Sequence, residues 1–250
     1  MVKLLVLYVF HQYNDRVDNF FKHSIFYDKN IDFLLICNDK SVNIDDKITH
    51  YNVSVFYRDN HGYDFGGWSD GLLTNNLYKN YTHFIFVNSS VIGPYLYPDY
   101  KGRWTDIYVE NLKDNVKLFG STINANPDYK TLQGDDKLPM AHLQSYIFSM
   151  DIITLYFLIK RGIFSNTVYV QSFHEAIYQK EVRMSRVIIE NGWNIGSLIK
   201  RYHGVDFTFK DKTVSDYEQE FHGDYMLAWK QSLWDKYDLV FIKGNRELEI

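Results

Sequence analysis

The segment that decides the fold class reads His83-Phe84-Ile85-Phe86-Val87-Asn88-Ser89-Ser90 (residues 83–90). Its apolar residues do not alternate with polar ones, which predicts a strand buried on both faces, as in a parallel sheet covered by helices. The small polar residues that follow mark the end of this strand. Further strands are predicted at residues 2–10, 31–37, 49–56 and 116–119, and the run 49–56 is the one that alternates.

Helical stretches lie between the predicted strands. This alternation predicts an α/β domain with a mainly parallel central sheet flanked by helices. Gly192 stands where the C-cap glycine of the last long helix belongs. The polar segment 124–138 is interpreted either as a mobile loop over a site or as a plain surface loop. The segment 210–250 is expected to be a C-terminal helical addition packed on the core. Helices are predicted at residues 15–27, 67–78, 104–112, 151–160, 174–190 and 225–236.

Composition excludes several classes of protein. With 46% hydrophobic and 23% charged residues, the 250-residue chain is not intrinsically disordered, and its formal charge of −4 gives no general attraction to nucleic acid. The single cysteine, Cys37, excludes a disulfide framework and favours a reducing, cytoplasmic location. No apolar run approaches the roughly 18 residues of a membrane span, so no transmembrane segment is expected. The aromatic content of 18% fits either a compositional bias or the stacking of aromatic rings on sugars.

Four polar clusters fall at the predicted carboxyl ends of strands, where ligands of an open parallel sheet bind. The first, residues 58–68, reads Arg-Asp-Asn-His-Gly-Tyr-Asp-Phe-Gly-Gly-Trp and stands between a predicted strand and a predicted helix. Its glycines let a backbone approach a ligand closely, and a helix N-terminus favours an anion. The second, residues 88–94, reads Asn-Ser-Ser-Val-Ile-Gly-Pro. The simpler interpretations are a tight structural turn for the first cluster and a strand end followed by a turn for the second.

The other two clusters lie in the second half of the chain. In residues 142–151, alternation places His142 and Gln144 on one face of a strand. In the last long helix, Glu181 lies on the polar side, ahead of Gly192-Trp193. The simpler interpretations are a buried histidine with its hydrogen bonds satisfied and a solvated glutamate. The sequence contains neither a Cys/His spacing for zinc nor a Gly-x-Ser-x-Gly motif.

Taken together, these clusters resemble one group of proteins. Four ordered motifs resemble uncharacterised glycosyltransferase-like proteins of plants, algae, protists and large viruses. A fifth motif, Arg58-x-Asn60-x-Gly62-x-Asp64-x-Gly66, more distantly resembles the rhamnan synthesis protein F family of polysaccharide glycosyltransferases. The resemblance runs from about Tyr8 to about Phe207. The four motifs are Asn88-Ser89-Ser90-Val91-x-Gly93-Pro94, Trp104-Thr105, Val116-Lys117-Leu118-x-Gly120-Ser121-Thr122-Ile123-Asn124 and His142-x-Gln144-Ser145.

The resemblance implies a GT-A fold in a single glycosyltransferase domain, with a Rossmann-like nucleotide-binding half (1–120), an acceptor half (121–209) and the extension 210–250. It implies a hexosyl- or pentosyltransferase of polysaccharide biosynthesis that moves a sugar from a nucleotide-sugar donor to a glycan or other hydroxyl acceptor, with inversion. In the GT-A pattern a Glu-Asp pair precedes a Gly-aromatic strand. Setting Gly192-Trp193 against that pattern makes Glu181 the general base. The other implied site residues are Tyr8, Val9, Arg58, Asn60, Asp64, Asn88, Ser89 and Ser90 for the donor, and His142 and Gln144 for the acceptor or sugar.

The sequence departs from the GT-A pattern at one point. An Asp-x-Asp that holds Mn²⁺ or Mg²⁺ is replaced by the neutral Asn88-Ser89-Ser90, whose oxygens bind a divalent ion poorly compared with carboxylates. Either the enzyme is metal-independent, or the nucleotide holds the ion together with Asp64 or His203. Arg58 is expected to offset the charge of the leaving diphosphate. Two alternatives stay open: a catalytically silent nucleotide-sugar-binding module on the same fold, and a different α/β enzyme acting on a phosphorylated metabolite.

Overall fold

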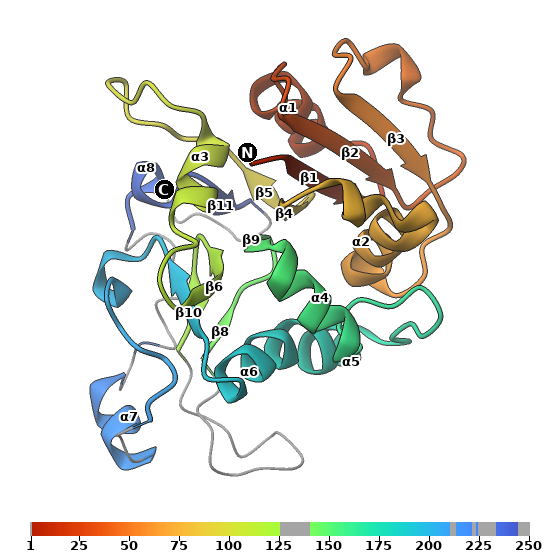
Figure 1. The fold of residues 1–250 in the computed structure, drawn as a ribbon. Coiled ribbons are helices and arrows are strands. Elements are labelled where there is room, and N and C mark those ends of the chain that lie inside the picture. The colour runs from red at the N-terminus through yellow and green to blue at the C-terminus, as the bar shows by residue number, and fades with distance from the viewer. Residues whose placement is uncertain (1, 126–140, 211–213, 222–223, 225–233, 245–250) are drawn as a thin grey trace.

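A seven-stranded sheet forms the centre of the computed structural model, which describes residues 2–125, 141–210, 214–221, 224 and 234–244. The strand order is β10-β6-β9-β4-β1-β2-β3 (Figure 1). Strand β9 runs antiparallel to its neighbours β4 and β6, and the other neighbouring pairs are parallel. The predicted α/β class with a mainly parallel sheet is therefore confirmed. The strands are β1 (Leu4–Phe10), β2 (Ile31–Cys37), β3 (Val53–Tyr57), β4 (His83–Asn88), β6 (Val116–Gly120), β9 (Ile147–Asp151) and β10 (Asn194–Ser197).

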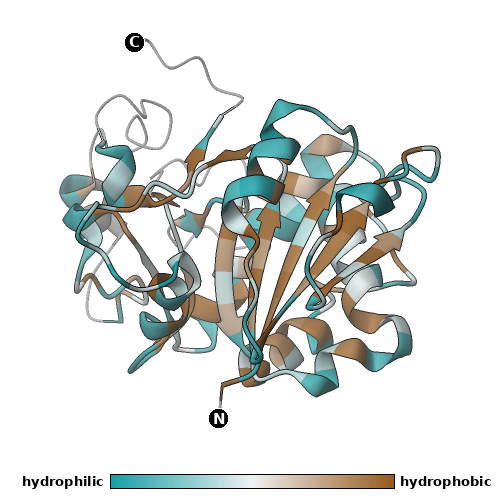
Figure 2. Ribbon diagram, turned by 90° about the horizontal axis from the view of Figure 1, so that it is seen from above, coloured by the Kyte–Doolittle hydropathy of each residue, from teal (hydrophilic) through white to brown (hydrophobic). Residues whose placement is uncertain are grey.

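Helices cover both faces of this sheet because its strands are apolar on both faces. In β1, Leu5 and Leu7 pack on one side, whereas Val6 and Tyr8 pack on the other. Figure 2 shows the result: the strands in the middle are mostly brown, and the surrounding helices combine brown and teal residues. The first face is covered by α2 (Tyr63–Leu73), α4 (Ile152–Lys160) and α6 (Arg183–Glu190), and the second by α1 (Asp15–Ser24) and α3 (Trp104–Glu110).

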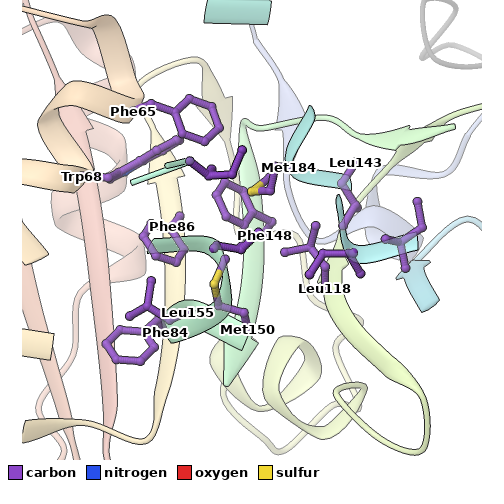
Figure 3. Close-up of a cluster of buried hydrophobic side chains, with 14 of the residues drawn as sticks. Phe65, Trp68, Phe84, Phe86, Leu118, Leu143, Phe148, Met150, Leu155 and Met184 are labelled. Atoms are coloured by element: carbon purple, nitrogen blue, oxygen red, sulfur yellow. The ribbon is translucent and has the colours of Figure 1, made fainter. Parts of the chain in front are cut away.

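Aromatic rings fill the core between α2 and the sheet (Figure 3). Phe86 of β4 and Phe148 of β9 stack with ring centroids 4.8 Å apart, and Trp68 of α2 meets both rings edge-on. Offset and edge-to-face pairs of this kind add about 0.5–1.5 kcal/mol each beyond the area that they bury. Much of the high aromatic content of the chain therefore serves the core.

Helix α2 corrects the predicted bounds of the second helix. It begins at Tyr63, not at residue 67, so Gly66 lies inside the helix and not in a turn before it. Close packing explains Gly67 and Gly71: a Cβ on Gly67 would lie 2.6 Å from the Val9 side chain, and one on Gly71 would lie 2.8 Å from Ile36. The glycines let α2 lie directly on β1 and β2.

The predicted long helix at residues 174–190 is also interrupted. It consists of a short helix α5 (Phe173–Glu175), a π segment (Ala176–Val182) and α6. Shorter pieces complete the fold: 3₁₀ turns at Asp45–Lys47, Thr74–Asn80 and Lys200–Tyr202, and helices α7 (Val214–Glu220) and α8 (Lys236–Leu239). Most of the predicted loop 124–138 and of the predicted helix 225–236 lies outside the described residues.

The C-terminal part of the described chain packs on the core. Strand β11 (Ile242–Lys243) pairs antiparallel with β5 (Val91–Ile92), which follows directly after β4 (Figure 1). Phe241 is fully buried beside Trp104 of α3. A second small sheet joins β7 (Ile123–Asn124) to β8 (His142–Leu143). Among the described residues, no helix combines the length and the apolar character that a membrane crossing requires.

Candidate active site at the carboxyl edge of the sheet

A polar cluster begins where β4 ends. The Asn88 side chain donates from Nδ2 to Asp64 Oδ2 at 2.9 Å, and its Oδ1 accepts from the backbone N–H of Ser90 at 3.0 Å. The Ser90 hydroxyl donates to the same oxygen at 2.5 Å. Asp64 lies in the first turn of α2, so the helix and the strand present these groups to one another. The structure thus brings together three of the predicted donor-site residues.

Asp64 is a carboxylate with a perturbed proton affinity. Burial raises its pKa from the ordinary 3.8 to about 6. The hydrogen bond from Asn88 and the positive charge of Lys243 oppose this rise, whereas the negative charge of Glu181 adds to it. Glu181 and Lys243 come from distant parts of the sequence, and their charges nevertheless change the pKa of Asp64.

Glu181 is held at the same edge by the loop after β8. Its Oε2 accepts from the backbone N–H of Ser145 at 2.7 Å and also from the Ser145 hydroxyl. Its other oxygen, Oε1, lies 3.8 Å from His142 Nε2. The Glu181 side chain keeps 17% of its surface exposed, so this carboxylate is both fixed and accessible. The solvated-glutamate interpretation does not describe a residue held in this way.

The π segment sets the direction of Glu181. Its neighbour Lys180 is buried and donates from Nζ to the carbonyl oxygens of Gly162 and Ile163, both at 2.8 Å. Burial lowers the pKa of Lys180 to about 8. One residue thus anchors the helix to the end of α4, while the next faces Ser145. π segments are rare, and they occur often at functional sites.

Gln144 and His142 are both buried, as the simpler interpretation of the third cluster expects. The Gln144 side chain accepts from the Thr122 hydroxyl at 2.8 Å, which ties the loop after β8 to the segment after β6. His142 stands beside Glu181, and Gln144 supports the loop that carries Ser145. His142 therefore lies within the polar cluster, whereas Gln144 lies behind it.

Tyr8 and Val9 belong to the core. Val9 packs against Gly67 of α2. The ring of Tyr8 is fully buried and stacks on Phe20 with centroids 3.9 Å apart. Its hydroxyl is buried without a hydrogen-bond partner in the part of the chain that the structure describes, and burial raises the pKa of Tyr8 far above its usual range.

Arg58 is a structural cross-link. Its guanidinium donates from Nε to Asp70 at 2.7 Å, from Nη1 to the side chain of Asn38 at 2.8 Å, and from Nη2 to the backbone oxygen of His61 at 2.8 Å. The side chain is 6% exposed. All three nitrogens are thus committed to joining the ends of β2 and β3 to α2, and this geometry favours the structural-turn interpretation over contact with a diphosphate.

Asn60 and His203 each line a cavity. Asn60 is exposed and lines a cavity of about 250 Å³ at the start of α2, together with Tyr63 and Tyr169. His203 lines a cavity of about 530 Å³ beside β6 and β10, and its charge acts on Asp238. The described residues contain no group of three or more His, Cys, Asp or Glu side chains arranged to hold a metal ion. An ion held by the nucleotide together with Asp64 or His203 stays a prediction.

Three residues of the cluster were not predicted. Ser145 stands within a quoted motif, next to Gln144, and only its role was missed. Arg16 lies in the helix that was predicted to follow β1, but no motif singled it out. It donates from Nε to the backbone oxygen of Ser89 at 3.1 Å. Lys243 carries no signal in the sequence, because only the pairing of β11 with β5 brings it to the site.

The chain is similar to one protein family and to solved structures. A mostly parallel sheet with a polar cluster at its carboxyl edge defines an α/β protein whose ligands are expected at that edge. Residues 33–221 match the model of the rhamnan synthesis protein F family, and because this is more than half of the chain, the protein belongs to that family. No curated protein matches the chain. Among solved structures it is similar to a cytidylyltransferase from Leptospira borgpetersenii serovar Hardjo-bovis (strain JB197), with 13% identity over 96% of this chain and 92% of that one, and a TM-score of 0.39.

Proposed function

We propose that this protein is a glycosyltransferase that moves a sugar from a nucleotide-sugar donor to a hydroxyl group of a glycan acceptor. The name of its family, rhamnan synthesis protein F, supports a role in making a polysaccharide. The observation that carries the proposal is the position of Glu181, a fixed and accessible carboxylate beside the Asp64–Asn88 pair at the carboxyl edge of the sheet.

The proposed reaction is a single displacement with inversion. Glu181 Oε1 accepts the proton of the acceptor hydroxyl while the hydroxyl oxygen bonds to the anomeric carbon of the donor sugar. The bond between that carbon and the diphosphate oxygen breaks, and its electron pair leaves with the nucleoside diphosphate. A base positioned in this way contributes about 10²–10⁴-fold to the rate.

The other residues of the cluster have supporting roles in this proposal. Ser145 holds Oε2, which leaves Oε1 for the acceptor. Asp64 and Asn88 face the donor, where carboxylate and amide groups hydrogen-bond sugar hydroxyls. His142, beside Oε1, orients the acceptor. Tyr8, Val9 and Arg58 support the site from the core and take no part in binding the donor.

Replacement of Glu181 by glutamine tests the proposal. The release of free nucleotide from a panel of UDP-, GDP- and dTDP-sugars is measured with and without glycan acceptors, alongside donor binding by calorimetry. Wild-type protein should bind and turn over at least one donor. Glu181→Gln should bind that donor with unchanged affinity and react about 10²–10⁴-fold more slowly.

Glu175→Gln is the matched control. Glu175 lies in α5 of the same interrupted helix, and its carboxylate accepts from the backbone N–H of Gln171, away from the cluster. Its rate should stay near wild type. A Glu181→Gln variant that keeps more than about a tenth of the wild-type rate would place the base elsewhere. The absence of binding to every donor would refute the glycosyltransferase proposal itself.

A further inference from the structure

A nucleoside diphosphate leaving group carries concentrated negative charge, and the proposed site must offset it. The residues at the end of β4, Asn88 to Ser90, are neutral. Arg58, the cation expected to meet the diphosphate, is committed to Asp70, Asn38 and His61. The cations of the donor site must therefore come from elements other than β3 and β4.

The C-terminal strand brings one cation to this edge. Lys243 pairs with Val91 in the short antiparallel sheet of β11 and β5, immediately beyond Ser90. The backbone N–H of the next residue, Gly244, donates to the backbone oxygen of Ser90 at 2.6 Å. Lys243 is partly exposed, and its charge acts on the Asp64 carboxylate.

The strand that carries Lys243 is firmly anchored. Phe241 is fully buried and meets the ring of Trp104 edge-on at 5.0 Å. The backbone oxygen of Val240 accepts from the N–H of Tyr95 at 2.7 Å, and that of Leu239 accepts from the hydroxyl of Ser121 at 2.9 Å. The position of Lys243 next to Ser90 is thus fixed by the core and does not depend on a ligand.

A second cation approaches from the opposite end of the chain. Arg16, in the first turn of α1, donates from Nε to the backbone oxygen of Ser89 at 3.1 Å. Its Nη1 and Nη2 atoms form no hydrogen bond or ion pair with the residues that the structure describes. The buried, unpartnered hydroxyl of Tyr8 lies close enough to Arg16 to feel its charge.

We propose that Lys243 and Arg16 together hold the diphosphate of the donor over residues 88–90, so that the C-terminal strand completes the donor site. The two residues come from different elements, and both elements contact the neutral backbone after β4: Arg16 donates to Ser89, and Gly244, next to Lys243, donates to Ser90. Ammonium and guanidinium groups form charge-assisted hydrogen bonds with phosphate oxygens, the guanidinium often in a bidentate manner. The inference rests on the proposed function, because it assigns the part of the donor that these residues bind.

The test compares nucleotides with and without their phosphates. Calorimetry, in the presence of a chelator, measures the dissociation constants of UDP, GDP, CDP and dTDP for wild-type protein, and competition NMR measures those of the matching nucleosides. Lys243→Gln and Arg16→Gln should each weaken the binding of the preferred diphosphate by about 10-fold or more, the loss expected for a charge-assisted hydrogen bond. Nucleoside binding should stay within about threefold of wild type, because the base and ribose do not contact these cations.

Two further variants separate charge from structure. Lys243→Arg keeps the charge and should retain diphosphate binding. Lys236→Gln removes an exposed lysine of α8, which stacks on Tyr95 away from the cluster, and should bind like wild type. Thermal denaturation of every variant checks that β11 is still in place.

The outcomes are distinct. Diphosphate affinity within about twofold of wild type in both glutamine variants, or an equal loss of diphosphate and nucleoside binding, would overturn the assignment while leaving the proposed function standing. An equal loss in Lys243→Arg and Lys243→Gln would also overturn it. If wild-type protein bound none of the four diphosphates, the proposed function and this inference would fall together.

Discussion

Asp64 should make the folded protein less stable at neutral pH than an uncharged residue would in the same place. Its folded-state pKa is raised to about 6, against an ordinary value of 3.8. At about 1.36 kcal/mol per pKa unit, the difference corresponds to about 3 kcal/mol that ionised Asp64 costs the folded state. The interaction of the carboxylate with the N-terminal end of α2 offsets about 0.3–1 kcal/mol of this cost. We therefore expect Asp64→Asn to raise the free energy of unfolding by about 2 kcal/mol at pH 7.5.

The sign of the effect follows from proton linkage. A group whose folded-state pKa is raised favours the folded state fully below its unfolded pKa of 3.8, and this contribution is lost as the pH rises through about 6. The stability difference between Asp64→Asn and wild type should thus be close to zero near pH 4. It should grow between pH 4 and 6 and stay constant above that range.

Urea denaturation followed by fluorescence, at steps between pH 4 and 8, measures this difference. In a thermal melt at pH 7.5, the gain should appear as a rise in Tm of about 4–8 °C, since about 1 kcal/mol moves the Tm of a chain of this size by 2–4 °C. Donor binding should fall in the same variant. Two results would show that burial does not control the pKa of Asp64: a variant less stable than wild type at pH 7.5, or a stability difference that is the same at every pH.

Three further predictions follow from the contacts of the site. Arg58→Ala should lower the free energy of unfolding by about 3–5 kcal/mol, because it leaves the Asp70 carboxylate in a broken buried pair; a fully stable variant with weakened donor binding would return Arg58 to the donor site. Ser145→Ala should lower kcat about 10-fold at unchanged donor affinity, since Glu181 loses one of its two hydrogen bonds from Ser145; a normal kcat would mean that the backbone N–H suffices. Chelator should leave most of the turnover intact, because residues 88–90 offer neutral oxygens; full loss with chelator and full recovery with Mn²⁺ would contradict this.

Local patterns predicted the parts of the fold that depend on neighbouring residues. The strand Ile31–Cys37 begins and ends where its apolar run does, and the strand at residues 83–88 ends in the polar residues that mark it. The first turn of α2 was missed because residues 63–66 were interpreted as part of a turn before the helix. Gly67 is glycine because Val9 of β1 lies against it, and a linear sequence does not display this contact.

The candidate site was predictable to the extent that its residues terminate strands or stand in a motif. Asn88, Asp64 and Glu181 belong to separate motifs, and the structure places them in one cluster. Arg58 carried the right charge in the right segment, yet its role depends on Asp70 and Asn38, whose side chains close around it. The place of Lys243 in the site could not be predicted, because a two-residue strand that pairs with another two-residue strand has no periodic pattern in the sequence.

The π segment couples the direction of Glu181 to the buried anchor Lys180. A π turn accommodates an additional residue compared with an α turn, and successive residues of an α-helix differ by about 100° around the axis. Deleting one residue between Ala176 and Lys180 would restore a regular helix only by turning Lys180 away from Gly162 or Glu181 away from Ser145. The length of this segment is therefore constrained separately from its composition: the exposed Gln179 can vary in chemistry, whereas a single insertion or deletion would separate the anchor of the helix from its carboxylate.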